Sequence, residues 1–165
     1  MKFILIYISF FSALLWFPVE SNAQYKLSDF EGRWRWISGT GDRDTLILVL
    51  ERIPGKEKLT GYHSFSHNGT VLENSIPETP NRTYDSATIY AEITVKGELG
   101  YVIEDHPRQS AYFGKIELLG NNKNTALFYT TWTERPHIFF GPAPPIPPGR
   151  TFPDNLILTR IISKE

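Results

Sequence analysis

The sequence of 165 residues contains no cysteine, which excludes disulfide bonds, thiol catalysis and a lipid anchor on cysteine. Its 17 basic and 18 acidic residues are interleaved, so no positive stripe exists to bind nucleic-acid phosphates or an anionic membrane surface. The nucleophile elbow of serine hydrolases, the glycine-rich phosphate loop and the His-Glu-x-x-His motif of zinc peptidases are also missing. These absences favour a protein that is not an enzyme, carries no cofactor or metal, and depends on its apolar core for stability.

The first 23 residues predict a signal peptide. Lys2 gives the positive start, Phe3–Phe17 an apolar run, and Ser21-Asn22-Ala23 a cleavage site with small residues. The apolar run is shorter than the roughly 20 residues that a membrane-spanning helix needs. We therefore expect a periplasmic or secreted protein without a lipid anchor, in which residues 24–165 form one domain.

Apolar and polar residues alternate along most of the remaining chain, and no segment shows a convincing helical period. Phe30, Gly32, Trp34 and Trp36 share one face of the first predicted strand. Asn68-Gly69 predicts a tight hairpin, because both residues tolerate positive φ. The other predicted strands are Leu46–Leu50, Leu59–Ser66, Thr70–Ser75, Ile89–Lys96, Tyr101–Glu104, Tyr112–Leu118, Thr125–Thr133 and Leu156–Ile162. This pattern predicts an all-β fold, a single up-and-down antiparallel barrel of eight or nine strands.

Three residues indicate how the barrel closes. Gly32 precedes Trp34 by two positions, which lets neighbouring backbone approach the indole ring. Arg160, on the last predicted strand, can lay its planar guanidinium over that ring in a cation–π contact. Such a contact would join the first strand to the last.

The inward faces of the predicted strands are rich in aromatic and aliphatic side chains. These side chains either fill the barrel or line one small cavity, and the sequence does not separate the two alternatives. The predicted lining consists of Trp36, Phe65, Ile93, Ile116, Phe128 and Trp132. If a cavity exists, its expected function is non-covalent binding of a small apolar or amphipathic molecule.

Residues 136–153 hold seven of the twelve prolines and cannot form a central strand. The segment is expected to be a stiff loop before the last strand, at one mouth of the barrel. The alternative function follows from it: a protein-interaction or inhibitor-like module that binds another exported protein through its rim loops and its proline-rich edge. The prolines of that edge are Pro142, Pro144, Pro145, Pro147 and Pro148.

The histidines are the remaining candidates for chemistry. His63 and His67 lie four positions apart, which on a strand is about 13 Å and too far to share one metal ion. They are interpreted as turn histidines that form hydrogen bonds. Glu104-Asp105-His106 is interpreted as a solvated turn, because no positioned nucleophile accompanies it. An enzyme that uses His63 or His106 is the third and weakest alternative.

Several segments together resemble an uncharacterised group of secreted Bacteroidetes proteins with a lipocalin-like domain of unknown function, over nearly the whole mature chain. They are Phe30–Trp36, Thr45–Leu50, Gly61–His63, Gly114–Leu119, Ala126–Trp132 and Pro153–Arg160. More distantly, Gly32-x-Trp34 with Arg160 is similar to the signature of lipocalins, fatty-acid-binding proteins and avidins, which implies a calycin-like barrel of ligand-binding ancestry. The motif between the middle strands of lipocalins is not recognisable, and the proline-rich insert is unusual for these groups. The resemblance implies no catalytic residues.

Overall fold

A computed structural model of the chain describes residues 25–39, 43–78, 86–95, 97–106, 110–136, 151 and 153–162, with only the backbone of 132–136. The predicted signal peptide lies outside the described residues. So do the five prolines of the predicted partner-binding edge and the side chain of Trp132.

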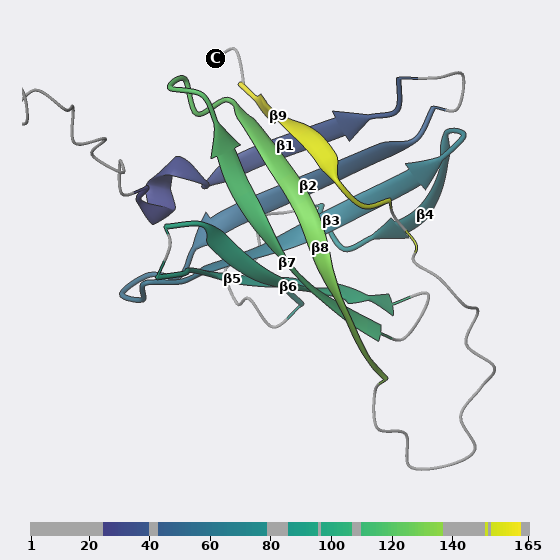
Figure 1. The fold of residues 1–165 in the computed structure, drawn as a ribbon. Coiled ribbons are helices and arrows are strands. Elements are labelled where there is room, and N and C mark those ends of the chain that lie inside the picture. The colour runs from purple at the N-terminus through teal and green to yellow at the C-terminus, as the bar shows by residue number, and fades with distance from the viewer. Residues whose placement is uncertain are drawn as a thin grey trace, which may run out of the picture.

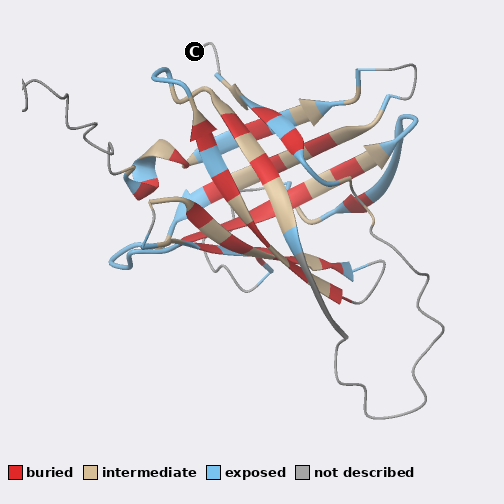
Figure 2. Ribbon diagram, in the orientation of Figure 1, coloured by how far each residue is buried: buried red, intermediate tan, exposed pale blue. Residues whose placement is uncertain are grey.

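One short 3₁₀ helix and nine strands make up the described fold (Figure 1). The elements are η2 (Leu27–Asp29), β1 (Gly32–Ile37), β2 (Thr45–Arg52), β3 (Leu59–His67), β4 (Thr70–Asn74), β5 (Ile89–Ile93), β6 (Leu99–Asp105), β7 (Ser110–Leu119), β8 (Thr125–Pro136) and β9 (Leu156–Ile161). Figure 2 shows buried residues alternating with more exposed ones along most strands, as the period of two requires.

Eight of the strands close into an antiparallel barrel, which confirms the predicted fold. The sheet order is β2-β1-β9-β8-β7-β6-β5-β3-β4, and the pairing of β2 with β3 completes the circle. β4 is the ninth strand and lies outside the circle. It pairs with the second half of β3, from Ser64 to His67, while Leu59–Gly61 in the first half pair with β5.

The three residues predicted to close the barrel meet beside η2. Trp34 pairs with Arg160 across β1 and β9, and the guanidinium carbon lies 4.3 Å from the centre of the indole ring. The Trp34 Nε1–H donates to the carbonyl of Phe30 (2.8 Å), while the guanidinium donates to the carbonyls of Asp29, Glu31 and Lys123. This end of the barrel is thus sealed by the cation–π contact and by backbone carbonyls that find donors.

Asp29 adds a charged contact to the same end. Its carboxylate accepts a hydrogen bond from the Lys26 amide (2.9 Å) and lies 2.8 Å from Lys123 Nζ. Burial alone would raise the pKa of Asp29, but hydrogen bonds from Lys123 and the Lys26 amide lower it below the ordinary value.

Apolar side chains from every strand of the closed circle pack inside the barrel. Trp34, Leu46, Leu48 and Leu158 are fully buried. Tyr101 and Phe128 stack at 4.7 Å with nearly parallel rings.

The predicted lining residues divide between the packed core and its edge. Phe65, Ile116 and Phe128 are buried members of the core, whereas Trp36 and Ile93 are partly buried against it.

Candidate functional site

The end of the barrel opposite η2 carries the buried polar side chains. It is formed by the β3–β4 hairpin, the end of β6, the start of β7 and the segment that precedes β9 (Figure 1). Facing residues on paired strands share one side of the sheet, so pairing with core residues identifies those that point inward. His63 pairs with the core residue Leu48. Asp105 pairs with Ser110, two residues along each strand from the buried pair Ile103 and Tyr112. These polar residues therefore belong to the inward face.

A β-bulge in β4 determines which of its side chains faces inward. The two-residue turn at Asn68-Gly69 would pair Phe65 with Leu72 if the register continued regularly. Instead, Ser66 pairs with Val71 and Phe65 pairs with Glu73, which makes Leu72 the extra residue. Glu73 is consequently buried opposite Phe65, and Leu72 is 49 % exposed. The bulge therefore places a carboxylate inside the barrel and an aliphatic side chain outside.

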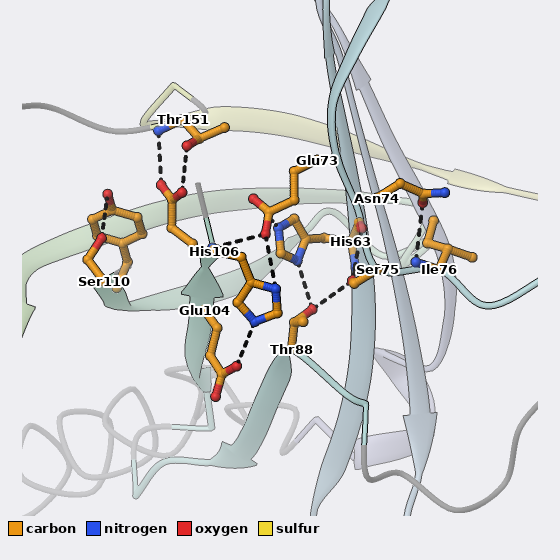
Figure 3. Close-up of polar contacts among 12 residues, drawn as sticks. His63, Glu73, Asn74, Ser75, Ile76, Thr88, Glu104, His106, Ser110 and Thr151 are labelled. Atoms are coloured by element: carbon orange, nitrogen blue, oxygen red, sulfur yellow. Dashed lines mark hydrogen bonds and ion pairs between the residues drawn. The ribbon is translucent and has the colours of Figure 1, made fainter. Parts of the chain in front are cut away.

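His63 is the partner of this carboxylate. Its Nε2 lies 3.0 Å from Glu73 Oε2, and neither side chain is more than 5 % exposed. The two side chains are therefore within ion-pair distance of each other in the interior. On its other side, His63 Nδ1 forms a hydrogen bond with Thr88 Oγ1 (2.8 Å), which in turn bonds to Ser75 Oγ (2.8 Å) (Figure 3).

Ser75 fastens the end of β4 to β3. Its hydroxyl accepts from the His63 amide (2.8 Å) and donates to the His63 carbonyl (3.0 Å). The Ser75 amide donates to the same carbonyl (2.9 Å). The network therefore fixes the histidine by both its backbone and its ring.

His106 connects the network to solvent. It follows β6, and its amide donates to Glu73 Oε1 (3.1 Å). Its exposed ring lies with Nε2 3.1 Å from Glu104 Oε2. Glu73 thus ties β3, β4 and the end of β6 together, as Figure 3 shows.

Asp105 overturns the interpretation of 104–106 as a wholly solvated turn. It is the last residue of β6 and has no exposed surface. Its two carboxylate oxygens accept from the amide (3.0 Å) and the hydroxyl (2.5 Å) of Thr151. The contact joins positions 46 residues apart, so the sequence around Asp105 does not indicate that its carboxylate is buried. Nearby, Ser110 Oγ donates to Tyr112 Oη (3.1 Å), both side chains being buried.

A hollow of about 390 Å³ opens beside this polar end, and we call it the mouth hollow. Phe65, Leu72 and Pro153 supply its apolar lining, and Asp44, His67, Thr151 and Asp154 supply polar groups. Of the predicted lining residues whose side chains the structure describes, Phe65 alone takes part. His67 Nδ1 lies 2.8 Å from Asp44 Oδ1, so His67 faces the hollow and does not approach a metal site with His63.

The order hydroxyl, imidazole, carboxylate in Thr88, His63 and Glu73 is that of a hydrolytic triad. However, the Thr88 and His63 side chains are almost completely inaccessible, so a substrate does not reach the hydroxyl. Among the described residues, no group of three or more His, Cys, Asp or Glu side chains could hold a metal ion. The described polar groups at the mouth form hydrogen bonds and charge pairs with one another.

No helix in the described ranges is long and apolar enough to cross a membrane.

Comparison with known proteins assigns a family. Searches of curated proteins and of solved structures return no significant match. The model of a family of unknown function, DUF6705, matches residues 1–160, which is nearly the whole chain. The protein therefore belongs to the DUF6705 family and contributes to it an eight-stranded closed barrel with one additional strand.

Proposed function

We propose that the protein binds, without covalent chemistry, a small amphipathic molecule at the mouth hollow, and that the bound molecule carries an amine or another hydrogen-bond donor at its polar end. The observation that carries this proposal is the hollow itself, in which an apolar wall faces carboxylates at the rim. Its volume of about 390 Å³ is within the range of roughly 300 to 1,000 Å³ of ligand sites, and such sites occur in the mouths of β-barrels.

The apolar part of the site supports burial of a compact hydrocarbon or aromatic group. Phe65 faces inward and is buried, while Leu72, pushed out by the bulge, stands at the edge of the hollow. Pro153 completes the wall. Apolar surface removed from water against such groups contributes roughly 25 cal/mol per Å².

The charge at the mouth supports a donor-bearing head. Asp44 and Asp154 line the hollow, and the carboxylates of Asp105 and Glu73 lie behind it. Among the described residues that line the hollow, His67 is the one that can carry a positive charge, and it is already paired with Asp44. A cationic or donor-rich group is therefore attracted to the rim, and an anionic one is repelled.

The finer family assignment forms part of the proposal. The closed barrel and the Trp34–Arg160 contact support a calycin-like ancestry, of the kind expected of secreted Bacteroidetes proteins. The predicted signal peptide at 1–23 supports export to the periplasm or beyond. Neither binding nor export requires an enzymatic step.

Two fluorescent probes of opposite charge test the site. The exported protein is titrated with dansylcadaverine, an aromatic fluorophore that carries an aliphatic primary amine, and with the anionic 1-anilinonaphthalene-8-sulfonate. Leu72→Trp fills the hollow, and Val71→Trp is its matched control, because Val71 is the exposed neighbour on β4 and does not line the hollow. We expect the amine to bind the native protein and Val71→Trp equally, and Leu72→Trp at least about tenfold more weakly.

Native mass spectra recorded before and after denaturing extraction then identify any molecule that copurifies from the exporting host. Equal affinity for both probes would contradict the donor-bearing head. An amine affinity that is unchanged in Leu72→Trp would contradict binding at the mouth hollow.

A further inference from the structure

A second hollow lies on the outer face of the barrel, across β5, β6, β7 and β8, and we call it the outer groove. Its volume is about 570 Å³. The strand register shows which side chains surround it: Tyr90 pairs with Val102, Val102 with Phe113, and Phe113 with Thr131. These four face outward because their neighbours along each strand, including Ala91, Tyr101 and Gly114, face the core.

Apolar character on this outward row is unusual for a barrel exposed to water. Tyr90 is 45 % exposed, and Val102 and Phe113 are half-buried. Because strands lie about 4.8 Å apart, the rings of Tyr90 and Phe113 stand about 10 Å from each other with Val102 between them. The row therefore forms an apolar platform across three strands, β5, β6 and β7.

Glycine makes the platform into a groove. In the adjacent outward row, Glu92 pairs with Gly100 and Gly100 pairs with Lys115, so bare backbone lies between two charged residues. A Cβ at Gly100 would meet only Thr94 Cγ2, at 3.1 Å, apart from a more distant carbonyl oxygen. A side chain at this position would therefore require Thr94 to shift by a few tenths of an ångström, and the absence of one leaves bare backbone in the trough.

The charges around the groove are already neutralised in pairs. Lys58 Nζ lies 3.1 Å from Glu92 Oε2, and Lys115 Nζ lies 2.6 Å from Glu98 Oε2. Lys115 donates a hydrogen bond to Glu98, and this bond raises the pKa of the ammonium group above its ordinary value. The described rim thus presents both donors and acceptors, and its charged groups occur in pairs of opposite sign, which suits a neutral ligand better than an ionic one.

We infer that the outer groove binds a neutral oligosaccharide. A pyranose ring has C–H groups on its faces, which suit an apolar aromatic platform, and hydroxyl groups around its edge, which both donate and accept hydrogen bonds. The platform contacts the C–H faces of the sugar, and the two lysine–glutamate pairs form hydrogen bonds with its hydroxyl groups. A platform about 10 Å wide accommodates roughly two sugar rings. This site is separate from the mouth hollow and does not depend on the function proposed there.

The test is an array of neutral glycans probed with the fluorescently labelled mature protein, followed by calorimetric titration of the strongest hit. Gly100→Val fills the trough, and Phe113→Ala removes one end of the platform. Ile157→Ala is the control, since Ile157 is an outward-facing apolar residue of β9 that does not line the groove. Thermal unfolding of each variant establishes that it is folded.

We expect at least one neutral glycan to bind. Gly100→Val and Phe113→Ala should each weaken that binding about tenfold or more, and Ile157→Ala should change it less than about twofold. No binding to any neutral glycan would overturn the proposal, as would a hit whose affinity is unchanged in Gly100→Val. Binding of the apolar dye N-phenyl-1-naphthylamine in the groove, without glycan binding, would replace the sugar with a purely apolar ligand.

Discussion

Removing the guanidinium of Arg160 should destabilise the whole barrel, because this side chain connects the last strand to the first. Arg160→Ala removes the cation–π contact with Trp34, worth about 1 kcal/mol when partly desolvated. It also leaves the carbonyls of Asp29, Glu31 and Lys123 without their donor. With roughly 0.5 to 1 kcal/mol for each hydrogen bond at a half-exposed site, the free energy of unfolding falls by about 2 to 4 kcal/mol.

Urea unfolding followed by tryptophan fluorescence measures this loss. With an m-value in the usual range, the midpoint should fall by about 1 to 2 M at constant slope. Arg160→Lys should retain about half of the lost stability, because lysine keeps the charge but lacks the planar fork. Arg33→Ala is the matched control, since Arg33 is exposed on the opposite face of β1 and should change stability by less than about 0.5 kcal/mol. Equal effects of Arg160→Ala and Arg33→Ala would refute the assigned closure.

Three other substitutions test the ends of the barrel. Gly32→Ala should cost about 1 to 3 kcal/mol in thermal unfolding, because φ is +115° and the new Cβ would press on the Arg160 guanidinium; a neutral result would contradict this strain. Asp29→Asn should cost less than about 1 kcal/mol at pH 7. Because folding lowers the pKa of Asp29, its contribution exists above the unfolded pKa of about 3.9 and should disappear as pH falls through the folded value; a difference from the native protein that persists at pH 2 would contradict this. Glu73→Leu alone should lower the free energy of unfolding by about 3 to 5 kcal/mol, because it leaves buried His63 without its carboxylate. The double variant, His63→Leu with Glu73→Leu, should recover most of that loss. Additive losses of the two single variants in urea unfolding would show that the pair is not coupled.

Features encoded within one strand or one turn could be predicted from the sequence. The alternation around Trp34 is local, and the structure places β1 where that alternation predicts it. The hairpin at Asn68-Gly69 has both residues at positive φ, +51° and +78°, because the dipeptide itself tolerates that conformation. Closure into one barrel could be predicted because a chain of short strands with one buried face leaves few other solutions.

The missed residues depend on contacts between distant parts of the chain. The sequence around Asp105 is typical of a turn, and only the folded barrel brings Thr151 to its carboxylate. Gly114 looks unremarkable beside Tyr101, yet a Cβ on Gly114 would overlap the Tyr101 ring, which lies across the glycine. Glu73 was missed because an ordinary hairpin register turns it outward, and only the bulge turns it inward. No local pattern distinguishes these positions.

The bulge at Leu72 bears directly on the proposed binding at the mouth. A regular register would place Leu72 against Phe65 and leave Glu73 in water, so the interior would be wholly apolar at that point. The observed register instead buries a carboxylate with His63, an arrangement that is generally no more stable than well-packed hydrocarbon of the same volume. The same shift moves Leu72 to the edge of the mouth hollow, where its side chain becomes part of the apolar wall. Stability therefore does not account for the bulge. The proposed binding offers a reason for it, because an amphipathic ligand needs a rigid polar end beside an apolar wall.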